Sequence, residues 1–264
     1  MYETTYHRAK SASDAASKLG SADDGKYISG GQTLLPTMKA RLAAPSDLVD
    51  LTTIEGMSGI AVDASGVTIG AATTHAEVAA SAEVASAIPA LAALAHHIGD
   101  PAVRNRGTIG GSIANNDPAA DYPAACLGLG ATIVTDKREV AADDFFTGMF
   151  ETALADDEII MGVKFPKASK AGYEKFPNPA SRYAMVGVFA AQAADGVRVA
   201  VTGAGNDGVF RHKAMEAALS NWSGDAVADI PTPAGDMLSD IHGTSEYRAH
   251  LVGVMAKRAV AKAG

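Results

Sequence analysis

The chain has 264 residues, 47% of them hydrophobic, with 30 acidic against 22 basic side chains and a formal net charge of −8. This charge argues against a nucleic-acid partner, because phosphate binding needs clustered Lys and Arg. No apolar run approaches the ~20 residues of a membrane-spanning helix and MYETTYHRAKSASDAASKLG lacks the features of a secretion signal, so we expect no transmembrane segment and a cytoplasmic location.

The first unit is predicted at residues 1–54. Residues 11–20 begin like a helix, with Ser11 and Asp14 at the spacing of a capping box and Gly20 at the end. GKYISGGQTLLPTMKARLA then indicates a short strand, a glycine turn and a helix, and DLVDLT indicates another strand. These patterns predict a small α/β unit.

A second unit is predicted at residues 55–170. GVTIGAATT indicates a strand, and Thr74 and Glu77, again at capping-box spacing, begin the helix that follows. Helical pattern resumes in IPALAALAHHIGD, and ATIVTD and DEIIMGVKFP indicate two more strands. The adjacent His96 and His97 favour a role at the end of a helix over metal ligation, because neighbouring helical side chains point ~100° apart.

The single cysteine, Cys126, restricts the inorganic chemistry of this chain. One thiol cannot form an internal disulfide, hold an iron–sulfur cluster with four thiolates or build a cysteine-rich zinc site. Any iron–sulfur cluster must therefore belong to another chain. The apolar surroundings of Cys126 in DYPAACLGLGATI are typical of a buried, inert thiol on a helix.

The third unit is predicted at residues 171–264. YAMVGVFAAQAADGVRVAVTGA holds two apolar runs around Asp195 and Gly196, which is a strong hairpin signal, and two helical patterns follow in FRHKAMEAALS and SEYRAHLVGVMAKRAVAKA. GAGNDG at residues 203–208 matches the dinucleotide pattern G-x-G-x-x-G. Its strand is the second arm of a hairpin, so we interpret this stretch as a tight turn.

Two glycine pairs, each in a different unit, carry the strongest functional signal. Gly30 and Gly31 in YISGGQTLLP follow a strand, and Gly110 and Gly111 in RGTIGGSIANNDP follow Thr108. Adjacent glycines let backbone N–H groups approach an anion, and neighbouring hydroxyls add donors. Two such loops could hold the two phosphates of a pyrophosphate without a lysine. The alternative is that both are ordinary turns.

YISGGQTLLPTMKARLAAPSDLVDLTTIEGMSGI and IGDPAVRNRGTIGGSIANNDPAADYPA resemble the FAD-binding medium subunit of the molybdenum hydroxylases, the group of aerobic carbon monoxide dehydrogenase and xanthine dehydrogenase. The resemblance covers nearly the whole chain and includes ASRYAMVGVFAA. It implies an α+β fold, in which two α/β subdomains of the PCMH/VAO type hold FAD between them and precede a domain with a small antiparallel sheet and helices. Ser29 and Thr33 depart from the usual first motif but keep its hydroxyl.

The resemblance also implies the residues that bind FAD. Both glycine motifs would hold the pyrophosphate, Tyr183 would stack on the flavin ring and Lys175 would approach it. The alternatives are that Tyr183 is a core aromatic and that Lys175 is a solvated charge. For Asp117 and Asp121 the alternative is that they cap a helix that starts at Pro118. No catalytic residue and no metal ligand are expected, and the predicted cofactor-binding set is Ser29, Gly30, Gly31, Gln32, Thr33, Leu34, Leu35, Pro36, Thr108, Ile109, Gly110, Gly111, Ser112, Asn116, Asp117, Asp121, Lys175 and Tyr183.

By this resemblance the chain is the electron-transfer subunit of a carbon monoxide dehydrogenase-like, FAD-dependent oxidoreductase. A large partner subunit would carry the molybdenum cofactor and a small one [2Fe–2S] clusters, in a dimer of heterotrimers, and FAD would relay electrons to an external acceptor. One alternative is a free-standing flavin oxidase or reductase of the related fold, for which the C-terminal unit offers no evident acid and base groups. The other is a scaffold without a cofactor, against which the two intact glycine motifs argue.

Overall fold

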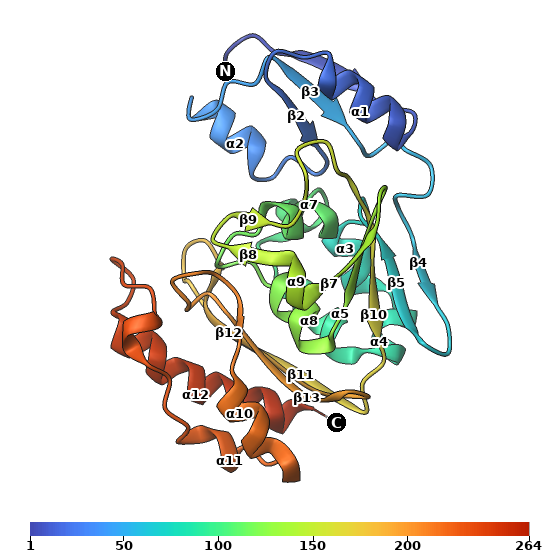
Figure 1. The fold of residues 1–264 in the computed structure, drawn as a ribbon. Helices are drawn as coiled ribbons and strands as arrows, with labels where there is room; N and C mark the ends of the chain where they lie inside the picture. The colour runs from blue at the N-terminus through green and yellow to red at the C-terminus, as the bar shows by residue number, and fades with distance from the viewer. Residues whose placement is uncertain (264) are drawn as a thin grey trace.

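The N-terminal residues form the upper lobe in Figure 1, a three-stranded parallel sheet in the order β1-β3-β2. The structure is a computed structural model, and it describes residues 1–263. Ser11 accepts a hydrogen bond from the Asp14 amide, which confirms the predicted start of the first helix. The elements of the lobe are β1 (Thr5–Arg8), α1 (Ala12–Gly20), β2 (Gly25–Ile28), α2 (Leu34–Lys39) and β3 (Asp47–Asp50).

A five-stranded antiparallel sheet lies below this lobe, in the order β4-β5-β10-β6-β7. Its strands are β4 (Ile60–Val62), β5 (Gly66–Gly70), β6 (Thr132–Thr135), β7 (Glu139–Ala141) and β10 (Ile160–Pro166), and a short hairpin joins β8 (Phe146–Gly148) to β9 (Glu151–Thr152). The helices of this unit are α3 (His75–Ala80), α4 (Ala82–Ala87), α5 (Pro89–His96), α6 (Pro101–Arg104), α7 (Ile109–Asn115), α8 (Tyr122–Leu129) and α9 (Ala142–Phe145).

Helix starts in this unit follow the predicted capping chemistry. Thr74 and Glu77 form the expected capping box at α3, since each side chain binds the backbone of the other residue. The helical pattern then breaks at Ser81, whose hydroxyl accepts a hydrogen bond from the Val84 amide and starts α4. Local sequence therefore determines where these helices begin.

The C-terminal unit is an antiparallel sheet in the order β11-β12-β13-β14, covered by helices on one face. The predicted hairpin is confirmed, with Gly196 at φ 125° in its turn. GAGNDG forms the irregular connection between two antiparallel strands, so it lacks the strand–helix geometry of a dinucleotide motif. The elements are β11 (Lys170–Pro177), β12 (Ala184–Ala193), β13 (Gly196–Thr202), β14 (Phe210–Arg211), α10 (Lys213–Ala218), α11 (Asp225–Ala228), α12 (Ser245–Lys262) and two 3-10 helices, η1 (Leu219–Asn221) and η2 (Ala234–Asp236).

Helix α8 joins the second unit to the C-terminal sheet. All of its residues are buried, and a Cβ on Gly128 would lie 2.6 Å from the Phe189 ring on β12. Cys126 on this helix is fully buried, and burial raises the pKa of its thiol, as expected for an inert cysteine. The other face of the sheet packs on α12 and forms a second core.

The main hydrophobic core runs through all three predicted units. The first two large sheets fall within residues 1–54 and 55–170, and the third begins at Lys170, one residue before the predicted boundary at 171. A core shared by all three units does not test whether they fold separately. The boundaries stay a prediction. Within residues 1–263, no helix has both the length and the apolar character needed to cross a membrane.

Candidate cofactor site

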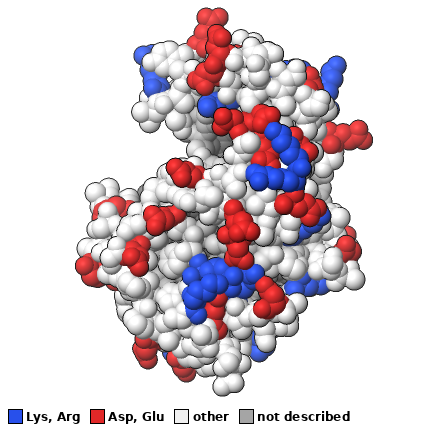
Figure 2. All heavy atoms as spheres, in the orientation of Figure 1, with Lys and Arg blue, Asp and Glu red and all other residues white. Residues whose placement is uncertain are grey.

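The two glycine motifs lie against each other at the junction of the upper lobe and the second unit. The hydroxyls of Ser29 and Thr108, 79 positions apart in sequence, are 3.0 Å from each other. A Cβ on Gly30 would lie 2.1 Å from the carbonyl oxygen of Arg106, so only glycine allows this approach. In Figure 1 the loop between β2 and α2 lies directly above α7. Figure 2 shows a deep notch on the left of the molecule at this junction.

The first motif offers a run of available backbone donors. Gly31 has φ +70°, in the left-handed region, and Thr33 returns to right-handed helical backbone before α2 begins. Among residues 1–263, no protein acceptor pairs with the backbone amides of residues 30 to 34. Gln32 and Thr33 are exposed. Successive unpaired amides in such a turn form an anion-binding concavity, so this loop suits a phosphate group.

The second motif does not supply free amides, and this part of the prediction was wrong. Gly110 and Gly111 lie in the first turn of α7, where Thr108 is the N-cap and accepts a hydrogen bond from the Gly111 amide at 3.2 Å. The amides of Ile109 and Gly110 donate to carbonyl oxygens of the loop that follows β5, at 3.1 and 2.8 Å. The sequence resembled a turn because a capped helix that begins with two glycines has the same local pattern.

The second motif contributes fewer polar groups to the junction than the first, and they are mostly side-chain hydroxyls. Thr108 faces Ser29 with its hydroxyl, Gly111 is exposed, and Ser112 is half-buried. Gly110 is buried, and a Cβ there would lie 2.6 Å from the Ala71 side chain. The two glycines therefore differ in role, since Gly110 allows close packing and Gly111 keeps the N-terminal turn of α7 open.

Asn116 holds the β8–β9 hairpin, and its contact with FAD stays a prediction. It ends α7 in the left-handed conformation, with φ 41°, and only 1% of its surface is exposed. Its side-chain amide donates to the carbonyl oxygens of Gly148 and Glu151, both at 2.8 Å, and its carbonyl oxygen accepts from the Phe150 amide. Both amide hydrogens are thus used within the chain.

The helix expected from Pro118 begins instead at Tyr122, which is a second correction. The Asp117 side chain accepts a hydrogen bond from the Ala119 amide and forms a turn. The Pro118 carbonyl oxygen accepts from the Thr202 hydroxyl at 3.0 Å and so faces the C-terminal sheet. The Gly203 amide donates to the same oxygen at 2.7 Å, so both acceptor positions of this carbonyl are used by the C-terminal sheet, and the chain stays irregular until Tyr122. Burial raises the pKa of Asp117.

Asp121 and Lys175 form a buried ion pair between α8 and β11. The Lys175 Nζ atom lies 2.8 and 3.1 Å from the two Asp121 oxygens, and each side chain is 4% exposed. The Tyr173 hydroxyl donates to Asp121 at 2.5 Å, and Lys175 also donates to the His97 carbonyl oxygen at 2.9 Å. Burial raises the pKa of Asp121, while Lys175 lowers it. The alternative of a solvated lysine is wrong, and contact of either residue with FAD stays a prediction.

Tyr183 lies beside the turn that follows the second motif. The residue is 46% exposed, so the alternative of a core aromatic is wrong. Burial of its hydroxyl and then the nearby carboxylates of Asp117 and Asp121 raise the pKa of Tyr183. The amide of Ala184 donates to the Ala119 carbonyl oxygen at 3.3 Å, which ties this aromatic to the same turn.

His75 is a residue of this region that the sequence analysis did not single out. It is the first residue of α3 and is 5% exposed. Its ring packs against Gly107, next to the second motif, where a Cβ would lie 2.6 Å from the Nε2 atom. Burial, and to a lesser extent Arg104, lowers the pKa of His75 to about 4. A histidine directly after a capping threonine was the only sequence signal.

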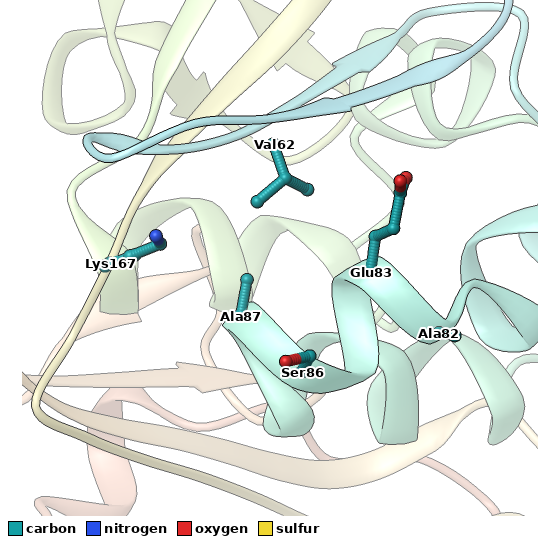
Figure 3. A pocket seen from close by; sticks show the side chains of 6 residues that line it. All are labelled: Val62, Ala82, Glu83, Ser86, Ala87 and Lys167. Carbon is teal, nitrogen blue, oxygen red and sulfur yellow. The ribbon is translucent and has the colours of Figure 1, made fainter.

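An open surface depression lies away from this junction (Figure 3). Glu83 and Lys167 lie on opposite sides of it, so their charged groups do not converge on a common point. The residues that line the depression are Val62, Ala82, Glu83, Ser86, Ala87 and Lys167.

Within the described residues no group of three or more His, Cys, Asp or Glu side chains is placed to hold a metal ion. The rings of His96 and His97 are nearly perpendicular and 6.2 Å apart.

The groups at the junction fit a flavin dinucleotide. The loop at residues 30–34 has unpaired amides for phosphate oxygens, and the hydroxyls of Ser29, Thr33 and Thr108 add donors around it. A half-exposed aromatic, Tyr183, is available to a flat ring. A Cβ on Gly30 would clash with the Arg106 carbonyl oxygen and would keep the two motifs apart.

Comparisons with known proteins agree with this fit. Residues 2–168 match the family described as the FAD binding domain in molybdopterin dehydrogenase. The chain is 36% identical to the nicotine 6-hydroxylase medium subunit of Paenarthrobacter nicotinovorans, over 98% of this chain and 96% of that protein. It is 33% identical to the carbon monoxide dehydrogenase medium chain of Hydrogenophaga pseudoflava, over 97% and 95%.

The structural comparison gives the same neighbour. The fold matches a solved structure of carbon monoxide dehydrogenase from Hydrogenophaga pseudoflava that lacks the Mo-pyranopterin moiety of the molybdenum cofactor, with a TM-score of 0.87 and 34% identity. The match covers 98% of this chain and 96% of that one. The expected α+β fold is thereby confirmed along nearly the whole length.

Proposed function

The chain belongs to the family of FAD binding domains in molybdopterin dehydrogenases, and from this premise we propose that it is the electron-transfer subunit of a carbon monoxide dehydrogenase-like molybdenum hydroxylase. It is thus a subunit of an FAD-dependent oxidoreductase. The observation that carries the proposal is the contact between the two glycine motifs, where the hydroxyl of Ser29, just before the unpaired amides of the first motif, lies 3.0 Å from the hydroxyl of Thr108.

The chain's own residues bind and orient the cofactor. The amides of residues 30–34 hold the pyrophosphate, and Ser29, Thr33, Thr108 and Ser112 supply hydroxyl donors around it. Tyr183 supplies an aromatic face for the isoalloxazine ring. The chemistry that FAD supplies when bound is redox transfer between [2Fe–2S] clusters of a partner subunit and an external acceptor.

The proposed partners are supported by the names of the relatives, which are medium subunits or medium chains. A large subunit with the molybdenum cofactor and a small subunit with [2Fe–2S] clusters complete the complex, and the assembly is a dimer of heterotrimers. Cys126 is the only cysteine in the chain, so this subunit cannot ligate such a cluster by itself. A cytoplasmic location stays part of this proposal.

Metal and flavin analysis of the native complex tests the proposal. The chain is purified with its associated subunits, and FAD, iron and molybdenum are measured per chain. We expect FAD with molybdenum and iron in stoichiometric amounts. FAD without metals or partner subunits would instead identify a free-standing flavoenzyme, and absence of FAD would overturn the proposal.

A further inference from the structure

The loop at residues 178–183, which connects β11 to β12, is closed by one buried side chain. Asn178 is 7% exposed, whereas the five residues that follow it are exposed. Its side-chain oxygen accepts hydrogen bonds from the amides of Ala180 and Ser181, at 2.9 and 3.1 Å. Its backbone amide donates to the Tyr183 carbonyl oxygen at 2.8 Å, and its carbonyl oxygen accepts from Arg182 at 2.9 Å.

These hydrogen bonds hold an unfavourable backbone conformation in place. Arg182 has φ +63°, a left-handed conformation in which a Cβ clashes with the backbone. Such conformations persist only where surrounding contacts determine them, and they gather at functional sites. Both backbone polar groups of the next residue, Tyr183, are hydrogen-bonded within the loop. Its amide donates to the Ser181 hydroxyl at 3.3 Å, and its carbonyl oxygen accepts from the Asn178 amide. The backbone position from which the Tyr183 side chain projects is thereby defined.

The loop places this aromatic next to the turn that follows the second glycine motif. Tyr183 is half-exposed and lies beside the turn at residues 117–121, which directly follows the second glycine motif. A stacking side chain that is already ordered loses little conformational freedom when a ring binds against it. Without the closed loop, Tyr183 would have to be ordered at the expense of binding energy.

We propose that Asn178 is a positioning residue for the flavin, which acts through Tyr183 by closing the loop at residues 178–183. The inference rests on the proposed function and adds to it a residue that has no direct contact with the cofactor. Its side-chain oxygen is the essential atom, since it accepts two of the hydrogen bonds that shape the loop.

The test is a double-mutant cycle on the complete complex, with flavin affinity and spectrum as readouts. We expect Asn178→Ala to weaken FAD binding about three- to tenfold, the range of one aromatic stacking contact, and to change the flavin absorption spectrum as Tyr183→Ala does. Because both variants lose the same contact, the double variant should bind FAD no more weakly than Tyr183→Ala alone. Asn178→Asp keeps the acceptor oxygen and should restore affinity and spectrum.

Arg182→Gly is the matched control. Glycine adopts positive φ without strain, so this variant keeps the loop conformation and should leave FAD binding unchanged. If Asn178→Ala does not yield folded chain, Asn178→Ser is measured by the same criteria. Unchanged affinity and spectrum in the Asn178 variant, or effects that add fully to those of Tyr183→Ala, would overturn this inference alone. Absence of FAD from the unmodified complex would overturn the proposed function together with it.

Discussion

The hydroxyls of Ser29 and Thr108 share a hydrogen bond of 3.0 Å across the junction between the upper lobe and the second unit. One hydroxyl precedes the first glycine pair and the other caps the helix that contains the second pair. This contact brings the two motifs together, and the amides of residues 30–34 have no acceptor within residues 1–263. The proposed cofactor site therefore depends on the closeness of these two segments.

Gly30→Ala should separate the two motifs. The new Cβ would lie 2.1 Å from the Arg106 carbonyl oxygen, so one of the two segments must shift. We expect FAD content of the purified complex to fall at least about tenfold, because the phosphate loop loses its position. The control is Gly20→Ala, at a glycine with open space around it, which should leave FAD content unchanged. Equal FAD content in the Gly30 variant would contradict the assigned phosphate loop.

Asp121→Asn should destabilise the chain by leaving the Lys175 charge buried without its partner. Breaking a buried ion pair in this way costs about 3–5 kcal/mol of unfolding free energy. Urea unfolding measures this loss, and the double variant Asp121→Asn with Lys175→Met should recover part of it. The exposed pair of Lys137 and Asp157 offers a control, since Asp157→Asn should leave the unfolding curve unchanged. A double variant no more stable than Asp121→Asn would argue against this explanation.

Stability should fall in acid through His75. Its pKa is lowered from an ordinary value of about 6.5 to about 4 in the folded chain, so the folded state favours the neutral ring. The stabilisation that follows is fully present above about pH 6.5 and is lost as the pH falls towards 4, with a total of about 3 kcal/mol. Urea unfolding of wild type and His75→Gln at several pH values isolates this contribution. The variant should lose less stability between pH 7 and 4, and parallel curves would exclude His75 as the cause.

Asn116→Ala should loosen the β8–β9 hairpin. The variant removes the donors to Gly148 and Glu151 and places an alanine in a left-handed conformation. We expect faster hydrogen exchange of the Phe150 amide, which donates to the residue 116 carbonyl oxygen. Asn116→Gly restores the backbone freedom but not the donors, so it should give an intermediate exchange rate. Protection of the Phe150 amide as in wild type would rule out this clamp.

Much of the local structure and part of the site could be predicted from residues close together in sequence. Ser11 and Thr74 mark helix starts, and Asp195 with Gly196 marks a hairpin, because caps and tight turns are made by neighbouring residues. The backbone of the first motif is likewise a local feature, because a glycine pair between a strand and a helix allows the left-handed conformation of Gly31.

The hydrogen-bond partners of the other predicted site residues depended on segments that only the folded chain brings together. Whether the amides of Ile109 and Gly110 are free depends on carbonyl oxygens in the loop after β5, and the local sequence around the second motif has no information about those acceptors. Asp121 likewise became a buried partner of Lys175, 54 positions away, because the folded chain places the residue before α8 beside β11. The sequence by itself thus determined many of the helix starts, the hairpin and the backbone of the first glycine loop. The tertiary structure decided which polar groups remain available, because hydrogen bonds between distant segments use up donors that appear free in the sequence.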